Sequence, residues 1–187
     1  DMHVNDVYIG NGVSELIVMA MQGLLDDGDE MLVPMPDYPL WTAAVNLSGG
    51  TAIHYKCDEE NFWYPDIADM ESKITPRTRG IVIINPNNPT GTWFGPQALE
   101  AFLSRVPESV LVVLDEAYIE YAEGDELPDG LTYLARYPNL LVSRTFSKAY
   151  GLAGMRVGYG IASSAELVGY LDRLRPPFNV TAISQAA

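Results

Sequence analysis

A single lysine lies in a glycine-rich stretch near the end of the chain, SRTFSKAYGLAGMRVGYG, residues 143–160. Lys148 follows two hydroxyl-bearing residues, Thr145 and Ser147, and an arginine, Arg156, comes eight positions later. A lysine amine whose pKa is lowered by a neighbouring cation acts as a nucleophile, and a guanidinium group binds phosphate through two parallel hydrogen bonds. The stretch therefore indicates amine chemistry beside an anion site, although a lysine taken alone is more often a surface residue.

Two further candidates follow apolar runs typical of buried strands. Asp115 ends the run VLVVLD (110–115), and Tyr118 comes three residues later. A buried carboxylate is unfavourable unless it meets a cation or a strong hydrogen-bond donor, so Asp115 predicts such a partner; a helix-capping aspartate is the alternative. Asn88 lies in NPNNPTG (85–91), a rigid turn whose amides can point into a cleft, although turn chemistry explains some of these residues.

The N-terminal part of the chain adds a candidate anion site and an aromatic face. GNGVSE (10–15) is a glycine turn that opens a predicted helix, where backbone N–H groups and the Ser14 hydroxyl can bind an anion. A plain glycine turn with a serine cap is the alternative. Tyr38 in PMPDYPLW (34–41) can offer its ring to a planar ligand, or it can be a packing residue. Together the candidates describe one ligand, a planar, phosphorylated, cationic ring that carries an aldehyde.

Alternating strand and helix patterns must position these residues. The predicted strands are 6–9, 30–34, 51–56, 80–85, 110–115, 140–145 and 156–162. The predicted helices are 14–28, 38–50, 65–74, 96–106 and 164–174, with Ser14 as the N-cap of the first, and 117–135 is read as an acidic excursion with a short helix. The pattern predicts an α/β fold of three layers, α/β/α, with a mostly parallel seven-stranded sheet. Ligands of such sheets bind beyond the carboxyl ends of the strands, where the candidate residues lie.

Composition excludes several classes of protein. The 187 residues predict one domain, 1–187, and their net charge of -14 argues against nucleic acid as a partner. The apolar runs are shorter than the roughly 20 residues that a membrane helix needs, so no membrane partner is expected. Cys57 is the only cysteine, and with only His3 and His54 beside it the sequence predicts no disulfide and no metal centre. We therefore expect a reducing, cytoplasmic location.

The motifs, in this order, resemble the large domain of the fold type I pyridoxal-phosphate enzymes, specifically the class I/II aminotransferases. The resemblance runs from about Asp6 to the end of the chain, and it rests on NPNNPTG, DEAY, SK and the arginine eight residues after that lysine. The first half is similar to bacterial alanine aminotransferases, whereas the chain from TWFGPQALEAFL onward is similar to histidinol-phosphate aminotransferases. The changeover falls near residues 91–95.

The resemblance implies a role for each candidate residue toward pyridoxal 5'-phosphate. Lys148 would carry the internal aldimine and then move a proton between the substrate and the cofactor. Asp115 would pair with the ring nitrogen, Tyr118 and Asn88 would hydrogen-bond the phenolic oxygen, and Tyr38 would stack on the ring. The phosphate would be held by residues of the first helix turn and of the lysine stretch: Val13, Ser14, Thr145, Ser147 and Arg156.

The resemblance also implies an activity and an assembly. The expected reaction is amino transfer between an L-amino acid (alanine or glutamate) or histidinol phosphate and a 2-oxo acid, in a homodimer. The family's chains are about twice this long, so we expect the small domain and an N-terminal segment to lie outside this sequence. The alternatives are a truncated or chimeric core that forms the aldimine with little turnover, another fold type I enzyme such as a lyase or decarboxylase, and a nucleotide-binding α/β domain.

Overall fold

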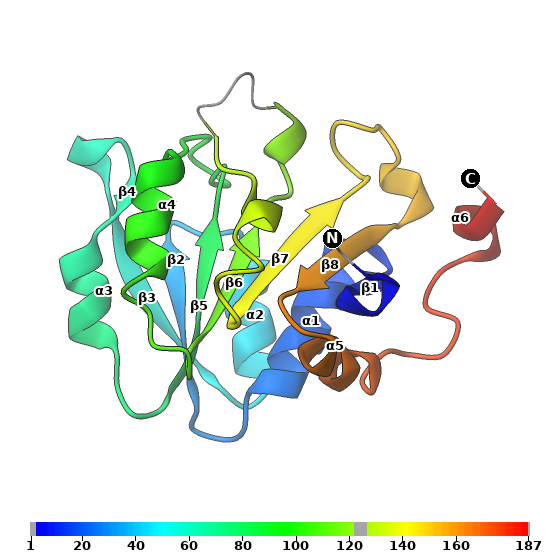
Figure 1. Ribbon diagram of the computed structural model, residues 1–187, viewed down its shortest axis with the longest axis horizontal. Helices are drawn as coiled ribbons and strands as arrows, with labels where there is room; N and C mark the ends of the chain where they lie inside the picture. The colour runs from blue at the N-terminus through cyan, green and yellow to red at the C-terminus, as the bar shows by residue number, and fades with distance from the viewer. Residues whose placement is uncertain (1–2, 122–126, 187) are drawn as a thin grey trace.

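The computed structural model describes residues 3–121 and 127–186, and its centre is one eight-stranded sheet (Figure 1). Part of the predicted acidic excursion, residues 122–126, lies outside the described residues. The strands are β1 (Val7–Gly10), β2 (Glu30–Met35), β3 (Thr51–Asp58), β4 (Tyr64–Pro65), β5 (Thr78–Ile84), β6 (Leu111–Asp115), β7 (Leu140–Thr145) and β8 (Gly158–Ala162). They are ordered β1-β8-β7-β6-β5-β2-β3-β4 across the sheet.

The sheet is mostly parallel, as predicted. Strands β7, β6, β5, β2 and β3 are parallel to one another, whereas β8 is antiparallel to both of its neighbours and β4 is antiparallel to β3. All seven predicted strands are confirmed, with ends within two residues of the prediction. The predicted count of seven is wrong by one because β4 has only two residues. The predicted start of the last strand at Arg156 is also wrong, because the φ of 57° at that residue is left-handed rather than extended.

All five predicted helices are present, and α6 is additional. The α-helices are α1 (Gly12–Leu24), α2 (Leu40–Leu47), α3 (Ile67–Lys73), α4 (Pro96–Leu103), α5 (Ala165–Asp172) and α6 (Ala182–Ala186). Short 3-10 helices are η1 (Val4–Asp6), η2 (Glu59–Asn61), η3 (Ile119–Tyr121), η5 (Gly130–Thr132) and η6 (Ala153–Met155). In the described part of 117–135 the predicted short helix is thus replaced by two 3-10 turns, η3 and η5. Of the helices described, none has the length and apolar character needed to cross a bilayer.

The first helix begins earlier than the sequence pattern suggested. Its N-cap is Asn11, and the chain turns at Gly12 with a φ of 72°, a left-handed value that glycine adopts readily. The backbone N–H of Asn11 donates to the Glu15 carboxylate at 2.7 Å, which satisfies this end of the helix. Ser14 therefore lies inside the first turn, and the prediction that it caps the helix is wrong.

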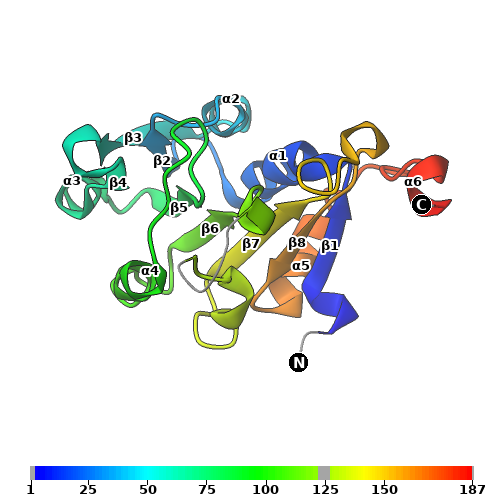
Figure 2. The same ribbon diagram turned by 90° about the horizontal axis from the view of Figure 1, so that it is seen from above.

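Helices cover both faces of the sheet, so the predicted three-layer α/β/α architecture is confirmed (Figure 2). Helices α1 and α2 lie over one face and α4 over the other. The second half of the central strand β5, residues 81–84, is apolar without interruption because its side chains enter both cores: Val82 and Ile84 pack in the α1/α2 core, whereas Ile81 and Ile83 pack in the α4 core. Burial of each such side chain stabilises the fold by about 1.5–3 kcal/mol.

Three parallel strands bring candidate residues to one edge of the sheet. Ile84 at the end of β5 is in register with Asp115 at the end of β6, and Asp115 is in register with Ser143 of β7. The arrowheads of β5 and β7 accordingly point to the same edge in Figure 1. Thr145 is the last residue of β7, and the turn that carries Lys148 begins directly after it.

Candidate active site

A cleft of about 300 Å³ opens at the carboxyl ends of β5, β6 and β7. All ten residues that the sequence nominated line this one cleft, although their positions in the chain run from 13 to 156. They are Val13, Ser14, Tyr38, Asn88, Asp115, Tyr118, Thr145, Ser147, Lys148 and Arg156. The remaining lining residues are Ile84, Ala117 and Ala153.

Asp115 forms the floor of the cleft. It is the last residue of β6 and only 4% exposed. Two donors reach its carboxylate: the indole Nε1 of Trp41 donates to Oδ2 at 3.0 Å, and the backbone N–H of Ala117 donates to Oδ1 at 3.2 Å. Trp41 comes from α2, so a helix on one face of the sheet orients a carboxylate at the strand ends.

Burial dominates the electrostatics of Asp115. Desolvation raises the pKa of this carboxyl above its ordinary value, while the Trp41 and Ala117 hydrogen bonds and the positive charge of Lys148 oppose the shift. No ion pair joins Asp115 to a Lys or Arg side chain within residues 3–121 and 127–186. A cation placed in the cleft at the carboxylate would therefore be bound favourably and would keep Asp115 ionised.

Lys148, Tyr118 and Asn88 form the next part of the wall. The Lys148 ammonium lies 5.0 Å from the centre of the Tyr118 ring, within the range of a cation–π contact. The Tyr118 hydroxyl accepts a hydrogen bond from the Asn88 side chain at 3.3 Å. Lys148 is an exposed residue, so its amine can meet a ligand that enters from solvent.

The third part of the cleft is a cationic corner at the N-terminus of α1. Arg156 donates to two backbone carbonyls, Ala153 O at 3.1 Å and Asn11 O at 3.4 Å, and no carboxylate pairs with it in the described part of the chain. Its guanidinium packs against Gly12, where an added Cβ would lie 2.4 Å from Nη2. The corner thus combines an arginine with the N-terminal N–H groups of a 13-residue helix.

Gly158 allows β8 to pack against the first turn of α1 at this corner. A Cβ at that position would lie 2.5 Å from the Val13 backbone nitrogen, so only glycine permits β8 to approach the first turn of α1 so closely. On the other side of the corner, the Ser147 N–H donates to the Thr145 hydroxyl at 3.1 Å, which orders the turn before Lys148.

Sequence reasoning missed the site residues that carry no distinctive local signal. Trp41, which holds Asp115 from behind the cleft, lies in a predicted helix, where a tryptophan is usually a packing residue. Ile84, Ala117 and Ala153 are apolar, and only their neighbours in the sequence pointed to the cleft. Among the residues that the structure describes, no group of three or more His, Cys, Asp and Glu side chains could hold a metal ion.

Comparison with known proteins places the chain among the aminotransferases. The family described as aminotransferase class I and II matches residues 2–187. Histidinol-phosphate aminotransferase 2 of Pseudomonas aeruginosa is 50% identical over 184 residues, which cover 97% of this chain and 48% of that protein. The glutamate-pyruvate aminotransferase AlaA of Escherichia coli K12 is 51% identical over 180 residues, which cover 93% of this chain and 44% of that protein. Relatives of both names therefore match on each side of the changeover expected near residues 91–95.

Solved structures agree with the sequence relatives. Histidinol-phosphate aminotransferase from Sinorhizobium meliloti, in complex with pyridoxal-5'-phosphate, superposes with a TM-score of 0.87 at 30% identity over 97% of this chain and 48% of that chain. An aminotransferase from Escherichia coli gives a TM-score of 0.83 at 46% identity over 96% of this chain and 47% of that chain. The chain spans about half the length of the curated relatives it matches. It belongs to the family of class I and II aminotransferases.

Proposed function

We propose that residues 1–187 are a single domain that binds pyridoxal 5'-phosphate and carries the catalytic residues of an aminotransferase. One observation carries the proposal: a buried carboxylate, an exposed lysine and an arginine at a helix N-terminus line the same cleft. The family of the chain supports it, as does the similarity to the Sinorhizobium meliloti enzyme, whose structure is a complex with pyridoxal-5'-phosphate.

The residues of the cleft fit this cofactor. Its phosphate suits the corner where Arg156 and the N-terminal turn of α1 meet, with Ser14, Thr145 and Ser147 able to donate hydroxyl hydrogen bonds. Its protonated ring nitrogen suits Asp115, whose carboxylate is buried and has hydrogen-bond donors but no paired cation in the described residues. Tyr38 borders the open side of the cleft, where its ring can cover a planar ligand.

When bound, pyridoxal phosphate withdraws electrons from the α-carbon of an amino acid joined to it. The protein residues then have distinct tasks. The Lys148 amine would hold the cofactor by its aldehyde, and it would also act as the acid/base that moves a proton between the substrate and the cofactor. Asp115 would keep the ring nitrogen protonated, because a buried ionised carboxylate stabilises an adjacent N–H cation. Asn88 and Tyr118 would donate hydrogen bonds to the phenolic oxygen.

The substrates that we propose come from the names of the relatives. Histidinol-phosphate and glutamate-pyruvate aminotransferases match this chain at 50% and 51% identity, so an amino donor such as L-glutamate, L-alanine or histidinol phosphate and a 2-oxo acid acceptor are expected. The homodimer and the cytoplasmic location stay predictions.

A cofactor titration tests the proposal. Added pyridoxal phosphate should produce a visible absorption band, and borohydride should then fix the cofactor to Lys148, as peptide mass spectrometry would reveal. Lys148→Ala should lose the band, whereas Lys73→Ala should keep it, because Lys73 pairs with Asp69 and the His54 carbonyl away from the cleft. A band that survives in Lys148→Ala would overturn the site.

Amino donors separate the enzyme from the alternatives. Addition of L-glutamate, L-alanine or histidinol phosphate should convert the cofactor to its amino form and release the matching oxo product. An unchanged spectrum with each donor would leave only a cofactor-binding core, and product analysis that detected carbon dioxide or an eliminated fragment would indicate a decarboxylase or a lyase.

A further inference from the structure

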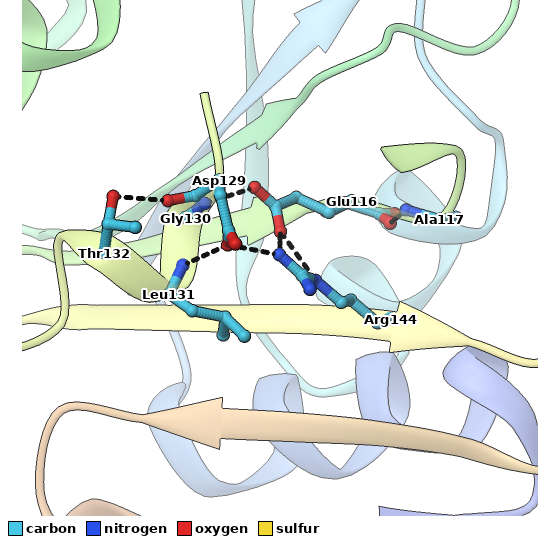
Figure 3. Close-up of polar contacts among 8 residues, drawn as sticks. Glu116, Ala117, Asp129, Gly130, Leu131, Thr132 and Arg144 are labelled. Carbon is cyan, nitrogen blue, oxygen red and sulfur yellow. Dashed lines mark hydrogen bonds and ion pairs between the residues drawn. The ribbon is translucent and has the colours of Figure 1, made fainter. Parts of the chain in front are cut away.

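A second polar cluster joins the ends of β6 and β7 outside the cleft, and Figure 3 shows its contacts among Glu116, Asp129, Gly130 and Arg144. Arg144 of β7 donates to the Glu116 carboxylate through Nε at 2.9 Å and Nη2 at 2.7 Å, and Nη2 also donates to Asp129 at 2.6 Å. The backbone N–H of Gly130 donates to the other Glu116 oxygen at 2.7 Å. None of these four residues lines the cleft.

Strand geometry links this cluster to the cleft. Successive side chains of a strand point to opposite faces, so the side chains of two residues that are neighbours in sequence lie on opposite faces of the sheet. Asp115 and Thr145 face the cleft, whereas Glu116 directly follows Asp115 and Arg144 directly precedes Thr145. The Glu116–Arg144 pair therefore spans β6 and β7 at the point from which both cleft residues project.

The cluster is built tightly. Glu116 is 1% exposed and the Arg144 side chain 12% exposed. A Cβ at Gly130 would lie 2.8 Å from Glu116 Oε1 and 2.7 Å from the Leu114 side chain, so the glycine lets the η5 backbone reach the carboxylate. Burial raises the pKa of Glu116, and Arg144 opposes that shift, so the carboxylate depends on this arginine to stay ionised.

We infer that Glu116 and Arg144 are a positioning pair that sets the separation between Asp115 and the turn carrying Lys148. Beyond the last paired residues of the two strands, the Glu116 N–H donates to the Ser143 carbonyl at 2.9 Å, and the side-chain pair extends this connection on the reverse face. Neither residue lines the cleft, so the pair acts through the strand ends and not in the chemistry. This inference rests on the proposed cofactor site.

The test begins without cofactor. The indole N–H of Trp41 donates to Asp115, so its ¹H–¹⁵N signal reports the placement of that carboxylate. Arg144→Met should shift this signal and change its pH titration, while the signals of the two other tryptophans, Trp63 and Trp93, should stay in place. The matched control is Arg79→Met, which breaks the pair with Asp29 at the amino end of β5 and should leave the Trp41 signal unchanged.

Cofactor affinity gives the second readout. Arg144→Met should weaken binding of pyridoxal phosphate by roughly tenfold, as expected when two contacting groups are coupled. The double variant Arg144→Met/Glu116→Gln should bind pyridoxal phosphate no more weakly than Arg144→Met alone. The reason is that the second substitution removes the buried carboxylate that the first one leaves unpaired. Glu116→Gln alone keeps an acceptor for the Gly130 N–H, so its affinity for pyridoxal phosphate should lie between those of the parent and Arg144→Met. This variant replaces Arg144→Met in the test if the arginine variant fails to fold.

The outcomes separate this inference from the proposed function. A parent protein that forms no absorption band with pyridoxal phosphate contradicts the cofactor site itself. A parent that binds the cofactor, with folded Arg144→Met and Glu116→Gln variants that keep the parent Trp41 signal and affinity, contradicts the positioning role alone. If Arg144→Met shifts the Trp41 signal no more than Arg79→Met does, the positioning role is also contradicted, because the pair then contributes only to the general stability of the fold.

Discussion

The indole of Trp41 donates a hydrogen bond of 3.0 Å to the carboxylate of Asp115, and the two residues are 74 positions apart in the chain. Trp41 is 0% exposed, so its N–H has no access to water. The bond therefore satisfies a buried donor and a buried acceptor together, and it holds the carboxylate in one orientation at the floor of the cleft.

Trp41→Phe removes that donor while it keeps an aromatic ring. We expect the free energy of unfolding to fall by about 2 kcal/mol, because a buried carboxylate loses a hydrogen bond and a gap is left beside it. The pKa of Asp115 should rise further. Urea unfolding measures the first effect. Trp93→Phe is the control, since Trp93 is 46% exposed, and its change should stay within about 0.5 kcal/mol; equal losses in both variants would contradict the role of the bond.

Asp115→Asn keeps the shape of the side chain and an acceptor for Trp41 but removes the charge. The rate of amino transfer should fall by roughly 10²–10³, because the carboxylate no longer keeps the ring nitrogen protonated. The free energy of unfolding should change by no more than about 1 kcal/mol, since the cost of burying a charge is removed with the charge. Steady-state rates and urea unfolding on the same preparation measure both. A rate equal to that of the parent would reject the proposed role.

Gly158→Ala should disrupt the cationic corner. The added Cβ meets the Val13 nitrogen at 2.5 Å, so the first turn of α1 must move away from β8. We expect pyridoxal phosphate to lose about 1–3 kcal/mol of binding free energy, the typical effect of overpacking, whereas pyridoxal without its phosphate should lose less.

Gly154→Ala is the matched control for that variant. Nothing lies within 4 Å of a Cβ at Gly154, and the residue is close to the cleft because its neighbour Ala153 lines it. Isothermal titration with both ligands makes the comparison. If Gly158→Ala weakens both ligands equally, the corner does not bind the phosphate.

Glu30 predicts a specific dependence of stability on pH. The Thr75 hydroxyl and the Arg77 guanidinium donate hydrogen bonds to this carboxylate and lower its pKa in the folded protein below the ordinary value of 4.5. A lowered pKa stabilises the fold above the unfolded-state value, and that stabilisation is lost as the pH falls through the folded-state value.

Glu30→Gln should therefore lower the free energy of unfolding at pH 7 by about 1 kcal/mol. The difference from the parent should shrink as the pH falls below about 4.5. Urea unfolding at a series of pH values measures it, with the exposed Glu59→Gln as the control. A difference that stays constant down to about pH 3, below the ordinary carboxyl pKa, would show that the carboxylate charge is not responsible.

Local pattern predicted much of the fold. Strand β5 could be recognised because Ile81, Val82, Ile83 and Ile84 form an unbroken apolar run, which only a strand covered on both faces can bury. The pattern could not locate β4, because two residues carry no periodicity. It also could not predict that β8 runs antiparallel to β7, because strand direction depends on how the intervening turn leaves the sheet, here through the left-handed Arg156.

The site residues also fall into two groups, those that the local sequence identified and those that only the folded structure identified. Asp115 and Lys148 could be recognised because a carboxylate at the end of an apolar strand, and a lysine among small residues, conflict with their local surroundings. Their roles remain proposals. Trp41, Glu116 and Arg144 could not be assigned, since each has an ordinary local context and acquires its partner only across the fold.

The sequence by itself determined the position of the seven longer strands to within two residues, because the burial of apolar runs and the polar residues that follow them are local properties. It therefore also determined which polar side chains would meet at one edge of a parallel sheet. Only the tertiary structure decided which donor holds Asp115 and which carboxylates hold Arg144. Those contacts join residues 74 and 28 positions apart for Trp41–Asp115 and Glu116–Arg144, and they exist only once helices and strands have packed.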